Sequence, residues 1–139
     1  MNAFVWKIRV YWEDTDAGGV VYHSQYLNFF ERGRTEWLRS IGVHQAKMAS
    51  EENVLFTIRH MDVDFVQAAR LDDELDVSVH TADVTGAKVT FSQNMTRCSD
   101  GQLIAAATLT AACLKADSFK PTRVPERIRA EIRGTDNAK

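Results

Sequence analysis

Four strand-like segments between residues 54 and 114, the last three of them separated by short turns, constrain the fold of the chain more than any other feature. Each is rich in β-branched and apolar residues, and together they cover Val54–Phe65, Leu75–Val84, Lys88–Cys98 and Leu103–Leu114. The dipeptide Thr85-Gly86 and the segment 99–102 have the composition of tight turns. Tight turns join antiparallel neighbours, so these segments predict an antiparallel sheet.

A fifth strand is predicted at residues 4–13, where apolar and polar side chains alternate. One face of this strand would carry Phe4, Trp6, Ile8, Val10 and Trp12, and the other Lys7, Arg9 and Glu13.

One long helix is predicted from Ser24 to Ile41, followed by Gly42 as a stop signal. Its apolar stripe consists of Leu27, Phe30, Trp37, Leu38 and Ile41. Gly33 lies inside this predicted helix, where glycine costs about 1 kcal/mol relative to alanine. We expect close contact between the helix and the sheet at Gly33 to compensate for this cost. Shorter helices are predicted at 44–52 and after Pro125. One long helix and five strands predict a single α+β domain over residues 1–139, whose open sheet edges favour dimerisation.

Composition narrows the class of protein. A length of 139 residues with 45% hydrophobic and 26% charged residues is typical of one globular domain. The formal charge of −2 argues against a general nucleic-acid or anionic-membrane binder. The longest uncharged stretch, 103–114, falls well short of the ~20 residues of a membrane helix, and the first ten residues lack a signal-like apolar run. We therefore expect a cytoplasmic protein without membrane insertion.

The two cysteines are expected to be reduced core residues. If the turn at 99–102 joins antiparallel strands, Cys113 lies near Lys88 and about 33 Å from Cys98 along the ladder, beyond disulfide reach.

The connector between the first strand and the helix carries more polar residues than a turn needs. It contains Asp14, Asp16, the pair Gly18-Gly19 and His23. Glycines let a ligand approach the main chain, and a helix start offers unpaired N–H groups to a carbonyl oxygen that gains negative charge. A nearby aspartate could act as a nucleophile or as the base for water. The residues alone also allow the simpler interpretation that both aspartates only stabilise turns.

The segment YWEDTDAGGVVYHSQYLNFFERGRTEWL, residues 11–38, resembles the signature D-x-D-x-x-G-x-V-[YW]-x-x-x-Y of the 4-hydroxybenzoyl-CoA thioesterase family. Within that family it is most similar to the acyl-CoA thioesterases associated with the Tol–Pal system. The resemblance implies a hotdog fold, in which an antiparallel sheet wraps a long helix. It also implies hydrolysis of acyl-CoA without a metal or redox cofactor, in a homodimer or homotetramer whose subunits share each active site.

The same resemblance assigns roles to single residues. Asp16 matches the catalytic carboxylate, whereas Asp14 is expected to hold the turn. The backbone N–H of His23 matches the group that polarises the thioester carbonyl. Gly19 is expected to lie against the substrate, and Tyr26 either lines the acyl pocket or packs in the core.

Cationic side chains are the candidates for holding the phosphates of coenzyme A. Arg59 and Lys88 are the principal ones, and solvated surface charge is the alternative for both. Coenzyme A and acyl carrier protein remain open as the carrier.

Two other functions are alternatives to hydrolysis. Hydratases of this fold carry histidine–proline motifs that are absent here, since both prolines lie at 121 and 125. A non-enzymatic acyl-binding or scaffold subunit, in phospholipid synthesis or the Tol–Pal machinery, remains the alternative.

Overall fold

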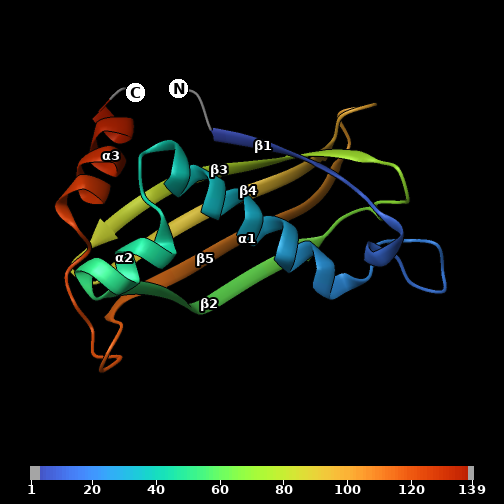
Figure 1. Cartoon of the computed structure of the whole chain (residues 1–139). Helices are drawn as coiled ribbons and strands as arrows, with labels where there is room; N and C mark the ends of the chain where they lie inside the picture. The colour runs from blue at the N-terminus through green and yellow to red at the C-terminus, as the bar shows by residue number, and fades with distance from the viewer. Residues whose placement is uncertain (1–3, 138–139) are drawn as a thin grey trace.

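A five-stranded antiparallel sheet forms the frame of the molecule in the computed structural model, which describes residues 4–137 (Figure 1). The strands lie in the order β1-β3-β4-β5-β2. Their bounds are β1 Phe4–Arg9, β2 Val54–Phe65, β3 Glu74–Thr85, β4 Lys88–Arg97 and β5 Leu103–Lys115. The antiparallel sheet predicted from the sequence is confirmed, and β2 occupies one of its edges.

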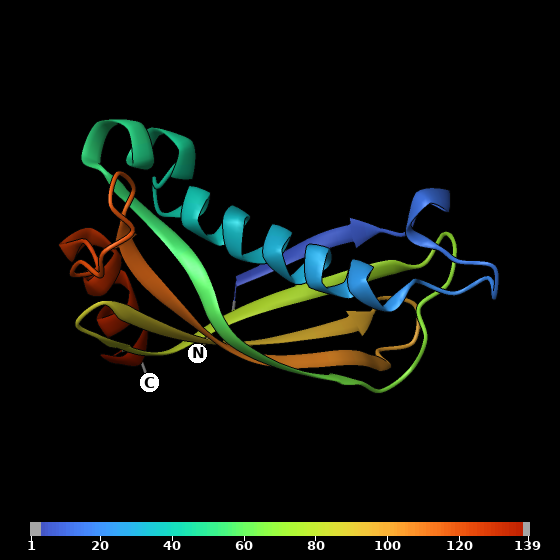
Figure 2. The ribbon, with the colours of Figure 1, turned by 90° about the horizontal axis from the view of Figure 1, so that it is seen from below.

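The long helix α1, His23–Ser40, lies along one face of this sheet, and the sheet curves around it (Figure 2). Two shorter helices, α2 Gln45–Glu52 and α3 Glu126–Asn137, lie at the end of the sheet where α1 finishes (Figure 1). A sheet that wraps one helix is the hotdog arrangement, so the predicted fold class is confirmed.

Gly33 brings α1 close to the sheet, as predicted. A Cβ atom at this position would lie 2.9 Å from Val77 Cγ1 and 3.3 Å from Gln93 Nε2. The fully buried Gln93 then ties the helix to β4, because its Nε2 donates to the carbonyl of Phe30 (3.0 Å) and its Oε1 accepts from Arg34 Nη1 (2.9 Å). The helix is therefore held at one height above the sheet by contact and by hydrogen bonds.

Two clusters of buried side chains share the space between helix and sheet. The first lies under the start of α1, with Phe29 and Phe30 against β1, β3 and β5. The second lies under its end, with Trp37 and Leu38 against Phe91 and α3. The predicted stripe was wrong at Leu27, which is 40% exposed, because the helix turns Phe29 toward the sheet instead.

The predicted first strand was too long. β1 ends at Arg9, and the chain turns into a short 3-10 helix, Trp12–Asp14, which leaves Trp12 79% exposed. The cause is Asp14, whose carboxylate accepts a hydrogen bond from the Tyr11 N–H at 2.8 Å and bends the chain there.

Both cysteines are free, as predicted, but only Cys113 is in the core. Cys98 follows the last residue of β4 and is half-buried, with Lys7 Nζ donating to its Sγ at 3.3 Å. The core assignment was wrong for Cys98 because it lies in the turn just beyond the strand.

Candidate active site

Asp14 anchors the connector between β1 and α1. It is 2% exposed, and its Oδ1 accepts from Gln25 Nε2 at 2.7 Å while its Oδ2 accepts from the Tyr11 N–H. Its carbonyl accepts from the Tyr22 N–H at 3.0 Å, which joins the connector to the residue before the helix. Both carboxylate oxygens are therefore used inside the turn, and the prediction that Asp14 is structural is confirmed.

Asp16, two residues further on, is presented to solvent by a tight loop. The loop is closed by the bridge between Thr15 and Val21 and by the Asp16 N–H, which donates to the Val20 carbonyl at 2.9 Å. One carboxylate oxygen, Oδ1, accepts from the Gly18 N–H at 2.8 Å, and among the groups that the structure describes none donates to the other. The carboxylate is thus held in one orientation with an oxygen left free for a ligand or for water.

Gly19 allows this loop to close. Its φ of +77° lies in the left-handed region, where a side chain would be strained, and its N–H donates to the Asp16 carbonyl at 3.0 Å. Nothing lies within 4 Å of the position of a Cβ atom, so the main chain is open on that side.

His23 is the first residue of α1, one residue before the helix start predicted from the sequence. The N-cap residue Tyr22 makes no capping hydrogen bond with its side chain, and its ring lies 4.3 Å from the exposed His23 imidazole. The first N–H groups of a helix have no partners within it, and they carry the positive end of the helix dipole. The loop therefore brings a fixed carboxylate and an uncapped helix start into the same part of the molecule.

Tyr26 lies one turn into α1 and is only 4% exposed. Its hydroxyl accepts from the Ala69 N–H at 3.1 Å, and its ring packs edge-on against Phe65 with centroids 5.4 Å apart. Within one chain Tyr26 fastens the segment after β2 to the helix, and its contact with a substrate stays a prediction.

The two candidate phosphate-binding cations lie away from this loop. Lys88 pairs with Thr85 at the far end of β3, which at strand rise is about 36 Å from the end near the connector. It also projects from the sheet face opposite α1, because its neighbour Val89 faces the helix. Arg59 is exposed on β2, beside the bulge between Ile58 and His60. One chain does not bring Lys88 together with Asp16.

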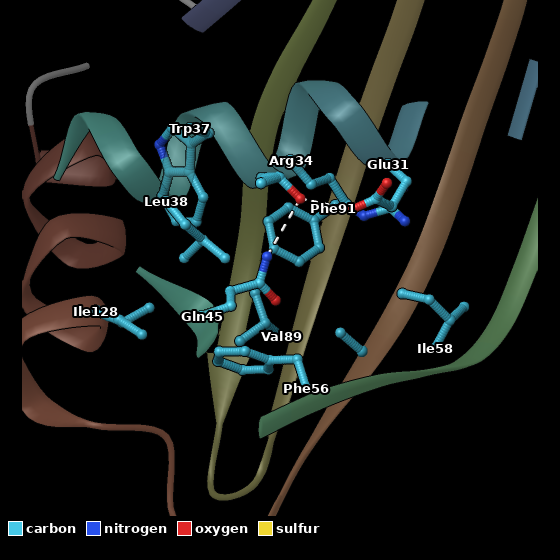
Figure 3. Close-up of a pocket in the computed structure, with 12 residues that line it drawn as sticks. Glu31, Arg34, Trp37, Leu38, Gln45, Phe56, Ile58, Val89, Phe91 and Ile128 are labelled. Carbon is cyan, nitrogen blue, oxygen red and sulfur yellow. Dashed lines mark hydrogen bonds between the residues drawn. The ribbon is translucent and has the colours of Figure 1, made fainter. Parts of the chain in front are cut away.

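A cavity of about 170 Å³ opens under the second half of α1 (Figure 3). Its walls come from α1, α2, α3 and strands β2, β4 and β5, and the lining residues are Glu31, Arg34, Thr35, Trp37, Leu38, Gln45, Phe56, Ile58, Val89, Phe91, Ala111 and Ile128. Glu31 and Leu38 lie about 12 and 22 Å along the helix from His23. The cavity is therefore at the opposite half of the helix from Asp16 of the same chain.

Polar side chains of α1 and α2 form one rim of this cavity. The Thr35 hydroxyl donates to Glu31 Oε2 at 2.5 Å and accepts from Gln45 Nε2 at 3.2 Å (Figure 3). Burial lowers the pKa of the Arg34 guanidinium, and the nearby Glu31 carboxylate opposes that shift. Arginine nevertheless stays charged at neutral pH, so a partly buried cation lies beside an otherwise apolar space.

Neither the cavity nor the Arg34–Gln93 pair was predicted from the sequence. The lining residues on α1 belong to the segment that resembles the thioesterase signature, and Trp37 and Leu38 were also predicted in its apolar stripe, but nothing in the sequence marked them as walls of a cavity. The walls come from segments up to 97 positions apart in the chain, from Glu31 to Ile128, so no local pattern brings them together.

No helix in the described part of the chain, residues 4–137, is long and apolar enough to cross a membrane.

Comparisons with known proteins agree with this fold. The model of the Thioesterase-like superfamily matches residues 10–132. The acyl-CoA thioesterase YbgC of Haemophilus influenzae is 40% identical over 129 residues, which cover 93% of each chain. A crystal structure of a probable thioesterase from Bartonella henselae superposes with a TM-score of 0.83 at 34% identity, covering 89% of this chain and all of that one. The 1,4-dihydroxy-2-naphthoyl-CoA thioesterase of Synechocystis has the same fold, with a TM-score of 0.89 at 24% identity over 97% of this chain and 98% of that one. On the matched span and these identities, the chain belongs to the Thioesterase-like superfamily.

Proposed function

We propose that this protein is an acyl-CoA thioesterase in which Asp16 activates water or attacks the substrate. The observation that carries the proposal is the free oxygen of a carboxylate fixed beside an uncapped helix start. The relative from Haemophilus influenzae is named as an acyl-CoA thioesterase, which supports coenzyme A as the carrier.

The chemistry needs only groups that the connector supplies. The thioester oxygen would accept a hydrogen bond from the His23 N–H, where the helix dipole stabilises the negative charge that develops. Asp16 would take a proton from water while the water oxygen bonds to the carbonyl carbon, and the carbon–sulfur bond would then break. The coenzyme A thiolate leaves and takes up the proton. If Asp16 attacks directly, an anhydride forms first and water cleaves it, and either route consumes one water.

Replacement of Asp16 by asparagine tests the assignment. The amide keeps the size of the side chain and can still accept from the Gly18 N–H, but it can neither take a proton from water nor attack a thioester. We expect kcat, measured by release of free thiol from acyl-CoA, to fall about 100-fold or more. The melting temperature should change little, because Asp16 is exposed.

Asp14→Asn is the matched control. An amide there has only one oxygen, whereas the Asp14 carboxylate accepts from both Tyr11 and Gln25. We expect a loss of stability of about 1–2 kcal/mol with most of the activity retained. Wild-type activity in Asp16→Asn would refute the catalytic role of Asp16, and a joint loss of activity and stability in both variants would indicate a purely structural turn.

We also propose that the protein forms a homodimer through the free edge of β2. This strand is 12 residues long, and a long unpaired edge readily pairs with another strand. Large apolar side chains are exposed on this strand and directly after it, at Ile58, Phe65 and Val66.

Antiparallel pairing of two β2 edges would bring complementary halves of the two subunits together. Phe65 ends β2 beside Tyr26 and the start of α1, whereas Phe56 and Ile58 at the other end line the cavity. A two-fold axis near the middle of the strand therefore sets the helix start of one subunit beside the cavity of the other. Light scattering at assay concentration should detect the dimer, and a fully active monomer would refute shared sites.

The cytoplasmic location, a tetramer built from dimers, acyl carrier protein as an alternative carrier and a link to the Tol–Pal machinery stay predictions. The thiol-release assay also separates hydrolysis from the alternative of a non-enzymatic acyl-binding or scaffold subunit, which would release no thiol.

A further inference from the structure

We infer that the cavity under the second half of α1 holds the acyl group of the substrate and limits it to about six non-hydrogen atoms beyond the carbonyl. This inference rests on the proposed function and on the shared site, because the acyl group would be presented to the partner's Asp16. Beyond the proposed function, the inference specifies the size of the acyl group, which neither the catalytic loop nor the signature motif determines.

The volume of the cavity sets the upper limit. A closed apolar cavity of about 150 Å³ holds a benzene molecule, and this cavity measures about 170 Å³. It therefore accommodates one six-membered ring or an aliphatic chain of similar size, and a tail of ten or more carbons exceeds it.

The cavity runs inward from the edge at which the partner is proposed to bind. Ile58, Ala111 and Val89 are cross-strand partners in one row across β2, β5 and β4, and all three line it. Exposure falls along this row from 43% at Ile58 to 2% at Ala111 and 1% at Val89. The open end thus lies at the β2 edge, and the closed end lies two strands, or about 10 Å, further in.

Apolar and polar walls explain why longer chains would be rejected. Leu38 and Ile128 close the inner end and are 5% and 1% exposed. The remaining side is the rim in which Thr35 links Glu31 to Gln45, with the Arg34 cation beside it. A longer tail would have to break these hydrogen bonds and remove charged groups from water, which is unfavourable for an apolar chain.

A series of straight-chain acyl-CoAs from two to sixteen carbons, assayed by thiol release, tests the limit. We expect kcat/KM to rise up to about six to eight carbons, since each methylene placed in an apolar pocket is worth about tenfold or more. It should then fall at least tenfold by twelve carbons.

Two reciprocal substitutions on directly paired residues should move the limit in opposite directions. Val89→Ala removes two methyl groups from the inner end and should extend the preferred chain by about two carbons. Ala111→Val adds two in the middle and should shorten it by a similar length. The double variant keeps the total volume and should return the preference toward that of the wild type.

Matched controls change the same residue types outside the cavity. Val77→Ala and Ala107→Val alter buried positions of the first cluster, which do not line the cavity. They should leave the order of preference unchanged even where stability falls. If Val89→Ala fails to fold, Ala111→Val alone still tests the inference.

The outcomes separate this inference from the proposed function. If no acyl-CoA of the series is hydrolysed, the proposed function fails, and the inference fails with it. If acyl-CoAs are hydrolysed but long chains react as fast as six-carbon chains, or the preference does not move in either variant, the inference is wrong and the thioesterase proposal stands.

A heterodimer tests which subunit supplies the cavity. One chain would carry Asp16→Asn and the other Ala111→Leu, which fills the cavity, and two affinity tags allow purification of the mixed dimer. If each site combines one chain's Asp16 with its partner's cavity, one of two sites is intact and about half of the wild-type activity remains. Activity no higher than that of the two parent variants would show that the cavity does not serve the partner's Asp16.

Discussion

Gly33→Ala tests how the spacing between α1 and the sheet is maintained. The added Cβ would lie 2.9 Å from Val77 Cγ1 and 3.3 Å from Gln93 Nε2. Neither neighbour can move freely, because Val77 is fully buried and Gln93 is hydrogen-bonded to the Phe30 carbonyl and to Arg34.

The two opposing contributions can be compared. Alanine in place of glycine favours a helix by about 1 kcal/mol. Overpacking of a well-packed core costs about 1–3 kcal/mol, and weakening of the Gln93 hydrogen bonds about 1 kcal/mol more. We therefore expect a net loss of about 1–3 kcal/mol in the free energy of unfolding, measured by urea denaturation.

Gly134→Ala is the control, since Gly134 lies in α3 with nothing within 4 Å of its Cβ position. This variant should be neutral or more stable by up to about 1 kcal/mol. A second control places Gly33→Ala in a Val77→Ala background, where the new methyl group has room and the cost should shrink by at least about 1 kcal/mol. If Gly33→Ala stabilises the protein as much as Gly134→Ala does, close packing at Gly33 does not set the position of the helix.

Two further predictions concern ionisable groups. Burial raises the pKa of the Cys113 thiol to about 11, from 9.0 for a free thiol, so the folded state holds this proton more tightly than the unfolded state. The stability that the protonated thiol provides is fully present below pH 9 and is lost as the pH rises toward 11. The difference in unfolding free energy between wild type and Cys113→Ala should therefore fall by about 1 kcal/mol from pH 8 to pH 10. A constant difference would refute the effect of burial. If Arg59 and Lys88 hold the phosphates of coenzyme A, KM should rise with salt up to about 0.3 M while kcat changes little. Arg59→Ala, at the β2 edge, should raise KM more than Lys88→Ala, and a KM independent of salt in wild type would indicate that neither cation contributes.

The fold was largely predictable because its signals are local. The bounds of β2 agree with the prediction at both ends, since turn residues flank an unbroken run of strand formers. The first strand was predicted too long because one side-chain hydrogen bond overrode a periodic pattern. Residues 10–13 continue the alternation of β1, yet the Asp14 carboxylate binds the Tyr11 N–H and ends the strand. The alternation of apolar and polar residues along the chain cannot reveal that hydrogen bond.

The carboxylate loop and the cavity likewise differ in how far the sequence could predict them. Asp14, Asp16, Gly19 and His23 lie within ten residues, so their types and spacing are visible in the sequence. The cavity residues are visible only after register is known: Ile58, Ala111 and Val89 become neighbours because β2, β5 and β4 pair in one particular alignment. A shift of one residue would turn Val89 to the outer face and Lys88 to the helix.

The length of α1 has a consequence that the local motif could not reveal. A helix of 18 residues spans about 27 Å, with the carboxylate loop at its start and the cavity under its second half. A thioester has its reacting carbon one bond from its acyl tail, so a single chain cannot use both its own Asp16 and its own cavity on one substrate. Either the cavity has no part in catalysis, or the cavity of one chain works with the Asp16 of a second chain. Pairing of two β2 edges about a two-fold axis would place them together. If the cavity takes part in catalysis, its separation from Asp16 along one helix requires the proposed dimer. The activity of the mixed dimer is therefore the measurement on which the two proposals jointly depend.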